Sequence, residues 1–187
     1  MDSERRPASA LEVLDVLKET TATRSRSTSR PLTYAQDPLL EEAKTLYTQK
    51  RLDEALAVYN KALQSNNTNP LGWQGYGLTQ RLRGQNQQAL TSFERALQLD
   101  AGLVISWNGK GSVLSKLQRH QEALEAFERA LQLDPHNAAA WNGKGAALNA
   151  LGRLNQALDA FETALRYDPQ LVQAYFNKCL LLHEMGR

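Results

Sequence analysis

The chain has 187 residues, with 22 Lys and Arg side chains against 20 Asp and Glu side chains, which gives a formal net charge of +2. Because this balance produces no strong positive field, the composition argues against a nucleic-acid partner. Apolar residues form 42% of the chain, but no uninterrupted apolar run reaches the roughly 20 residues of a transmembrane helix. We therefore expect neither nucleic acid nor a membrane as a partner.

The first ten residues carry charges of both signs and lack a long apolar core, so they do not form a secretory signal. Cys179 is the single cysteine of the chain, which excludes an internal disulfide and fits a reducing compartment. Both observations favour a cytoplasmic protein.

The first predicted element is a short amphipathic helix within residues 1–19, with its apolar face on Leu11, Leu14 and Leu17. The run Arg6-x2-Ser9-Ala10-x-Glu12-Val13-Leu14-x2-Leu17 resembles the last helix of bacterial serine/threonine protein kinase domains. This resemblance implies that residues 1–19 end such a domain; the alternative is a helix that caps or docks on other elements. No glycine-rich loop, His-Arg-Asp or Asp-Phe-Gly motif accompanies it in this sequence.

Residues 20–35 are rich in Ser, Thr and Arg and contain few apolar side chains. Such a segment has too little apolar surface to collapse. It is predicted to be a disordered linker.

Residues 104–137 and 138–171 are near copies of each other with a shift of 34 residues. A fixed period of this length indicates stacked supersecondary units. Each unit has two apolar runs at helical spacing, and Ile105, Trp107 and Leu114 mark the apolar face of the first run. One helical hairpin cannot bury its own apolar face, so the units must stack. The positions that agree include Trp107 and Trp141, Gly111 and Gly145, Ala123 and Ala157, Phe127 and Phe161, Ala130 and Ala164, and Pro135 and Pro169.

These units resemble the tetratricopeptide repeat, a helix–turn–helix family whose pattern runs W-x2-L-G-x2-Y, then A-x3-F, A and P. Two departures recur: Lys110 and Lys144 replace the leucine, and Leu114 and Leu148 replace the tyrosine. The resemblance covers roughly residues 36–187. It implies an all-α fold, an α-α superhelix or solenoid of helical hairpins.

Four complete units are expected, at residues 36–69, 70–103, 104–137 and 138–171. Residues 172–187 are either the first helix of an incomplete fifth unit or a capping helix. Asn69 is predicted to cap the helix that begins at Pro70. In the second unit Asp100-Ala101-Gly102 replaces the closing Asp-Pro, and we expect a looser turn there.

The sequence offers little chemistry. Gly109-Lys110-Gly111-Ser112 resembles the end of a phosphate loop, but Val104 stands where such a loop needs its first glycine. His120, His136 and His183 have no partner at metal-ligand spacing. No Ser/His/Asp or Cys/His arrangement is indicated, so we predict no enzyme, no catalytic residue, no metal and no cofactor.

In tetratricopeptide proteins the first helices line a concave side, which implies a groove for an extended peptide or a partner helix. An amide side chain offers one acceptor and two donors and can pair with a peptide backbone bidentately; the alternative is that the asparagines hold helix packing. Leu40 and Lys44 replace the lysine and asparagine of the carboxylate clamp in chaperone-binding members, so that clamp is not implied. The groove candidates are Gln74, Asn108 and Asn142 at one repeat position, Arg81, Ser115 and Asn149 at another, and Ser112 and Lys116 beside them.

The last predicted helix is apolar on most sides. We expect Tyr175, Cys179 and Leu182 to pack on the fourth unit. That arrangement leaves Phe176, Leu180 and part of Leu181 in water, either as a self-association surface or as an apolar anchor in the groove.

Three functional hypotheses follow. The first is a protein-interaction scaffold that binds a peptide or partner protein in the concave groove. The second is the C-terminal regulatory repeat region of a bacterial serine/threonine protein kinase. The third is a self-assembly module, in which the C-terminal helix makes a homo-oligomer.

Overall fold

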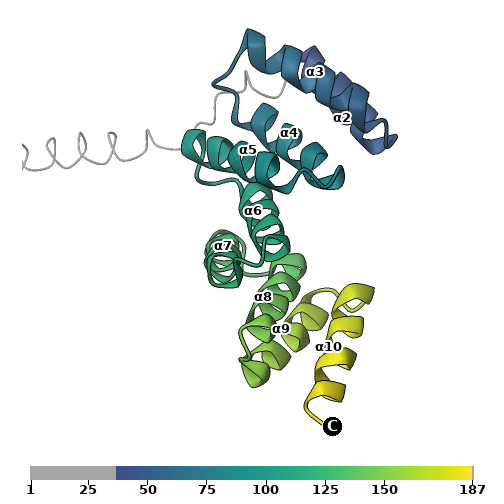
Figure 1. The fold of residues 1–187 in the computed structure, drawn as a ribbon, viewed down its shortest axis with the longest axis vertical. Coiled ribbons are helices and arrows are strands. Elements are labelled where there is room, and N and C mark those ends of the chain that lie inside the picture. The colour runs from purple at the N-terminus through teal and green to yellow at the C-terminus, as the bar shows by residue number, and fades with distance from the viewer. Residues whose placement is uncertain (1–36, 187) are drawn as a thin grey trace, which may run out of the picture. The chain divides into compact units, whose positions relative to one another are not determined.

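The computed structural model describes residues 37–186 (Figure 1). The predicted N-terminal helix and linker therefore lie outside the described residues, as does Arg187. The kinase resemblance of residues 1–19 stays a prediction.

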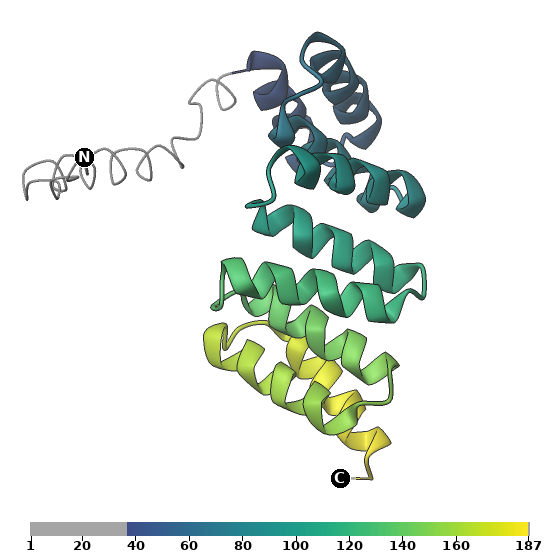
Figure 2. The same cartoon turned by 90° about the vertical axis from the view of Figure 1, so that its left-hand side faces the viewer.

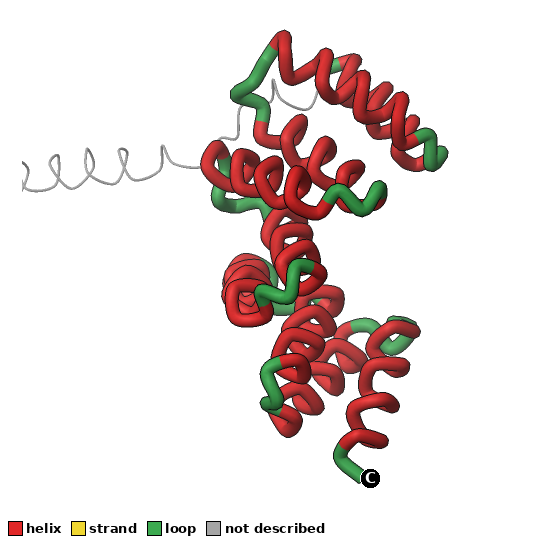
Figure 3. Tube along the Cα trace, in the orientation of Figure 1, coloured by secondary structure: helices red, strands yellow, loops and turns green. Residues whose placement is uncertain are grey.

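The described residues form nine α-helices and contain no strand (Figure 3). The prediction of an all-α solenoid of hairpins is confirmed. The helices pair as α2 with α3, α4 with α5, α6 with α7 and α8 with α9, and α10 follows as a single helix. Their bounds are α2 Pro38–Thr48, α3 Leu52–Ser65, α4 Pro70–Leu82, α5 Asn86–Leu99, α6 Val104–Lys116, α7 His120–Leu133, α8 Ala138–Ala150, α9 Leu154–Tyr167 and α10 Val172–Glu184.

The helices of this array stack in chain order (Figure 2). Each helix contacts the next one, and each first helix also contacts the first helix of the next unit, so that α2, α4, α6, α8 and α10 form a continuous row. No comparable row of contacts joins the second helices of the described units. The first helices therefore share one wall, which is where a groove was predicted.

The turn inside each hairpin depends on one residue with a left-handed backbone. Gly84, Gly152 and Gly186 have φ of 76°, 72° and 69°, and Lys50 and Gln118 adopt φ of 62° and 61° at the equivalent positions. Glycine has no side chain to oppose this conformation. This explains why a glycine recurs after the first helix.

The turns between units do not depend on proline. The Asp134 carboxylate accepts a hydrogen bond from the His136 N–H at 3.2 Å, and Asp100 accepts one from the Gly102 N–H at 2.9 Å. The backbone of Asp100 has φ −148° and ψ 99°, close to the −138° and 91° of Asp134. The expected looser turn at Asp100 is wrong, because an aspartate that bonds the backbone two residues on sets the turn by itself.

The prediction that Asn69 caps α4 is confirmed. Its side-chain oxygen accepts hydrogen bonds from the Leu71 and Gly72 N–H groups at 3.0 and 3.3 Å, and Pro70 opens the helix.

An aromatic ring from each second helix of units two and three packs between two glycines. The Phe93 ring lies against Gly77 of its own unit and Gly109 of the next, and the Phe127 ring lies against Gly111 and Gly143 in the same way. A methyl carbon added at Gly109 would come closer than 3.0 Å to the Phe93 ring, a separation that folded proteins avoid. The Gly-x-Gly segments of the first helices are therefore packing positions, which accounts for the likeness of Gly109-Lys110-Gly111 to a phosphate loop.

The tryptophans cover the joints between units. Each is half-buried, and its indole N–H donates to a carbonyl six residues earlier: Trp107 to Ala101 at 2.9 Å and Trp141 to Pro135 at 2.9 Å. The Trp107 ring contacts apolar clusters of two units. The assignment of these rings to packing holds, although they are partly exposed.

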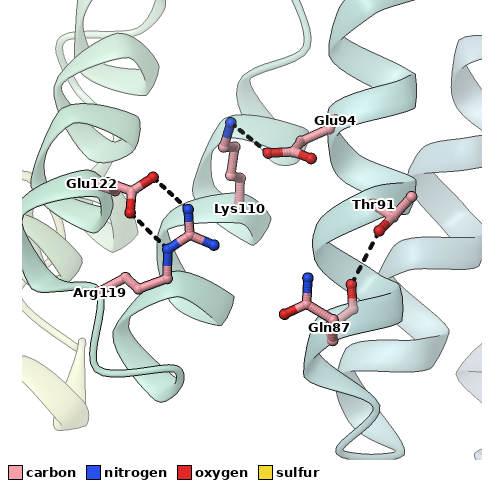
Figure 4. Close-up of polar contacts among 6 residues, drawn as sticks. All are labelled: Gln87, Thr91, Glu94, Lys110, Arg119 and Glu122. Carbon is pink, nitrogen blue, oxygen red and sulfur yellow. Dashed lines mark hydrogen bonds and ion pairs between the residues drawn. The ribbon is translucent and has the colours of Figure 1, made fainter.

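The lysine between the two glycines bonds to the preceding unit. Lys110 Nζ lies 3.1 Å from Glu94 Oε1 (Figure 4), and Lys144 pairs with Glu128 at 3.0 Å. Figure 4 also shows Arg119 at the start of α7 donating to Glu122, a bond that lowers the pKa of the Glu122 carboxyl. The lysines that replace the family's leucine thus act as contacts between units.

We predict that Gly109→Ala destabilises the array. Alanine favours helix over glycine by about 1 kcal/mol. However, the new methyl group would overlap the Phe93 ring, at a cost of about 1–3 kcal/mol, so a net loss of stability is expected in urea unfolding monitored by circular dichroism. The matched measurement is the same change in a Phe93→Leu background, where the added methyl group should cost less. An equal cost in both backgrounds would contradict this packing role.

Candidate functional site

The row of first helices lines an open central cavity of about 700 Å³, to which α4, α6 and α8 contribute most of the side chains. Polar side chains from these helices point into one space, as the equivalent repeat positions predicted. Of the eight predicted groove residues, six line this cavity: Arg81, Asn108, Ser112, Ser115, Lys116 and Asn142.

A second, N-terminal cavity of about 450 Å³ lies over α2 and α4. Gln74, the seventh predicted residue, lines it together with the apolar side chains of Leu71 and Leu78. Leu78 and Ile105 line both cavities, so the two are adjacent parts of one groove. Asn149, the eighth predicted residue, lines neither.

The apolar side chains in the N-terminal part of the groove were not predicted. Ile105 was expected on the packed face of its helix, whereas 54% of this side chain is exposed and it lies in the groove. Tyr47 and Tyr59 also line the N-terminal cavity. Leu71 and Ile105 occupy the same position of consecutive repeats, two residues before the tryptophan. This apolar pair was the sequence signal that could have indicated an apolar part of the groove.

Burial raises the pKa of Tyr59 from the ordinary 10.0 to about 12, and the hydroxyl is neutral at physiological pH with either value. Glu41 at the edge of the same cavity is paired with Lys44 at 3.8 Å. The N-terminal cavity is therefore suited to an apolar side chain.

Asn108 and Asn142 each already use one end of the side-chain amide in a hydrogen bond within the array. Asn108 Nδ2 donates to Asn137 Oδ1 at 3.1 Å, and Asn137 caps α8. Asn142 Oδ1 accepts from Asn177 Nδ2 of α10 at 2.9 Å. Each asparagine thus ties neighbouring first helices together and keeps only one end of its amide for a ligand, so bidentate pairing with a peptide backbone is not what these side chains offer.

Two further hydrogen bonds cross the wall. Ser106 Oγ donates to Gln74 Oε1 at 3.1 Å, and Arg81 Nη1 donates to Ser112 Oγ at 3.4 Å. Three of the six buried side-chain atoms without a hydrogen-bond partner in the described residues belong to the central cavity: Arg81 Nε, Asn108 Oδ1 and Ser115 Oγ. The other three, in Asn86, His120 and Asn149, lie outside it.

The last helix differs in part from its prediction. Phe176 and Leu180 are 57% and 51% exposed, as expected, but Leu181 is fully buried in the core. Tyr175 and Cys179, predicted to pack on the fourth unit, are exposed instead. Ala174 and Leu181 make the packed face of α10. The expected packed face was therefore wrong for these residues, and Leu181 is not part of an exposed apolar surface.

Within residues 37–186, no group of three or more His, Cys, Asp and Glu side chains could hold a metal ion. His120 contacts Gln118, and His136 packs edge-on against Tyr167. In the same part of the chain, no helix is both long and apolar enough to span a bilayer.

Among solved structures, the chain is similar to MamA 41-end from Desulfovibrio magneticus RS-1, with 20% identity, a TM-score of 0.72, and 79% of this chain and 84% of that chain covered. It is also similar to YrrB, described as a TPR protein with an unusual peptide-binding site, at 25% identity and a TM-score of 0.67, over 89% and 83% of the two chains. The first TPR of Spaghetti (RPAP3) bound to HSP90 peptide SRMEEVD is 19% identical, with a TM-score of 0.60 over 63% of this chain and 94% of that one. No curated protein matched the sequence.

Three family models, each described as a tetratricopeptide repeat, match residues 39–69, 77–132 and 114–187. Together they cover well over half of the chain, and the matched residues are those of the helical hairpins α2 to α10. The chain belongs to the tetratricopeptide repeat family.

Proposed function

We propose that the chain is a protein-interaction scaffold that holds an extended peptide segment of a partner protein in its concave groove. The observation that carries this proposal is the groove itself: two adjacent cavities run along α2, α4, α6 and α8, and they contain both apolar side chains and buried polar atoms without partners. A buried polar atom without a partner costs free energy that a ligand can recover.

The comparisons support the same class of function. YrrB is described as having a peptide-binding site, and the RPAP3 repeat domain is described in complex with a peptide. Members of this repeat family are typically scaffolds without catalytic activity, which agrees with our expectation that the chain is not an enzyme. We also propose that it acts in the cytoplasm.

A regulatory region of a bacterial kinase is a narrower form of this function. It rests on residues 1–19, which lie outside the described residues. The coding sequence upstream of Met1 tests it directly: a reading frame that continues into kinase motifs supports it, and one without them removes it.

Self-association is the second candidate, and the exposed apolar side chains of α10 favour it. Val172, Tyr175, Phe176 and Leu180 are each more than half exposed on one helix. Exposed apolar groups gathered in this way mark contact sites. Phe176 also stands one repeat after Asn142, which lines the central cavity, so the same side chain could serve as an apolar anchor for a peptide.

We predict that Ile105→Ser weakens peptide binding about tenfold or more. Ile105 reaches into both cavities, and burial of such a side chain contributes about 1.5–3 kcal/mol, where about 1.4 kcal/mol equals a factor of ten. Peptides selected by the wild-type chain from a random phage-displayed library serve as probes, with affinities measured by fluorescence anisotropy.

The matched control is Leu133→Ser on α7, because Leu133 is 47% exposed and lines neither cavity. It should bind like the wild type. Equal affinity of the Ile105→Ser and Leu133→Ser variants would place the binding site outside this groove.

We predict that the wild-type chain associates as its concentration rises and that Phe176→Asp stays monomeric, because a carboxylate cannot be buried unpaired in an apolar interface. Light scattering across a concentration series measures this, with Leu133→Asp as control. A wild-type chain that is monomeric throughout would exclude self-association. Loss of peptide binding in the Phe176→Asp variant would then identify Phe176 as an anchor in the groove.

A further inference from the structure

We propose that the groove recognises a peptide segment with an acidic group, held by Arg81 and Lys116, next to a bulky apolar residue seated in the N-terminal cavity. This inference rests on the proposed function, since it names the chemistry of the segment that the groove would bind.

The charged side chains that line the central cavity are all positive. Arg81 and Lys116 line it, and no Asp or Glu does. Within the described residues, neither cation forms an ion pair, whereas Lys110, Lys144 and Lys178, on the same row of helices, are each paired with a glutamate of the preceding unit. Two cations without a counter-ion in a concave site attract an anion.

The guanidinium of Arg81 has few hydrogen-bond partners within the protein, which leaves it available to an anion. Its Nε atom is buried without a hydrogen-bond partner, and its contact from Nη1 to Ser112 Oγ is long, at 3.4 Å. A guanidinium offers its donors in a fixed fork that matches the two oxygens of a carboxylate. A carboxylate in the central cavity would lie beside the guanidinium of Arg81 and in the same cavity as Lys116.

The polar atoms beside Arg81 fit a peptide backbone. Asn108 Oδ1 is a buried acceptor without a partner, because the amide nitrogen of the same side chain is already bonded to Asn137. A backbone N–H of the ligand can supply the missing donor. Ser115 Oγ, also buried without a partner, can donate to a ligand carbonyl or accept from a ligand N–H.

The apolar part of the ligand follows from the neighbouring cavity. Leu71, Leu78 and Ile105 line it, and the last two also line the cationic cavity. Leu78 and Arg81 stand three residues apart on α4, a rise of about 4.5 Å along the helix, and an extended chain advances about 3.3 Å per residue. The acidic group and the apolar side chain are therefore expected within about three residues of each other in the ligand.

The site differs from the carboxylate clamp of chaperone-binding relatives in place and composition. Leu40 and Lys44 do not supply that clamp in the first unit, whereas Arg81 and Lys116 stand in the second and third units. An acidic side chain and a C-terminal carboxylate both satisfy the same donors, so the experiment has to separate them.

The test begins with random peptides displayed on phage, in one library with a free C-terminus and one with a fixed C-terminal extension. Enrichment of an acidic residue next to an apolar one, in both libraries, identifies an acidic side chain. Selection from the free-ended library alone, with an apolar residue at a fixed distance from the C-terminus, identifies a terminal carboxylate. Selected peptides that show neither acidic enrichment nor dependence on a free C-terminus would overturn this inference but leave the groove as a binding site. No selection above background from either library would overturn the proposed function itself.

The selected peptide is then measured by fluorescence anisotropy against Arg81→Gln and Lys116→Gln. Each should bind about tenfold more weakly, as expected for the loss of one charge-assisted hydrogen bond. Removing the peptide's acidic group should weaken binding to the wild type more than binding to the Arg81→Gln variant, which keeps only Lys116. Arg95→Gln on α5 and Lys61→Gln on α3 are matched controls, since these cations line neither cavity. Thermal unfolding by circular dichroism checks that each variant is folded. Because Lys116 is exposed, its replacement should not affect folding, and the Lys116→Gln variant tests the inference even if Arg81→Gln is unstable.

Discussion

The repeat region depends on the contact between an aromatic ring and the two glycines that enclose it. Phe93 joins its own hairpin through Gly77 and the following hairpin through Gly109, and Phe127 repeats the arrangement one unit later. Since a single ring forms both the contact inside a unit and the contact between units, stability is shared along the array. This contact also brings two neighbouring first helices against the same ring.

Polar contacts supplement that packing on both faces of the first helices. On one face Lys110 and Lys144 pair with glutamates of the preceding unit. On the groove face Asn108 bonds to Asn137, the cap of the next first helix α8, and Asn142 bonds to Asn177 of α10. Exposed ion pairs stabilise little, roughly 0–1 kcal/mol each, so we regard these contacts as setting orientation. Each of these asparagines therefore holds neighbouring parts of the array together through one end of its amide.

The groove has a gradient of chemistry along the row of first helices. Its N-terminal part is mainly apolar, with Glu41 and Lys44 paired at its edge, and its central part carries Arg81 and Lys116 without a counter-ion among the described residues. Phe176 and Leu180 of α10 then present apolar surface again. A segment that combines acidic and apolar residues fits this order better than a uniformly charged one.

The sequence by itself determined the fold, because a period of 34 residues and the recurring glycine, alanine and aromatic positions leave stacked hairpins as the way to bury the apolar faces. It also placed Arg81, Asn108, Ser112, Ser115, Lys116 and Asn142 on one wall, since equivalent positions of a repeat face the same way. Only the tertiary structure decided which side chains were open. Ile105 is exposed and Leu181 is buried although both are aliphatic residues in first helices, because their burial depends on the neighbouring units and not on their own helix. The hydrogen bonds from Asn108 to Asn137 and from Asn177 to Asn142 could not be predicted from the sequence either, because they depend on distances between helices that only stacking sets.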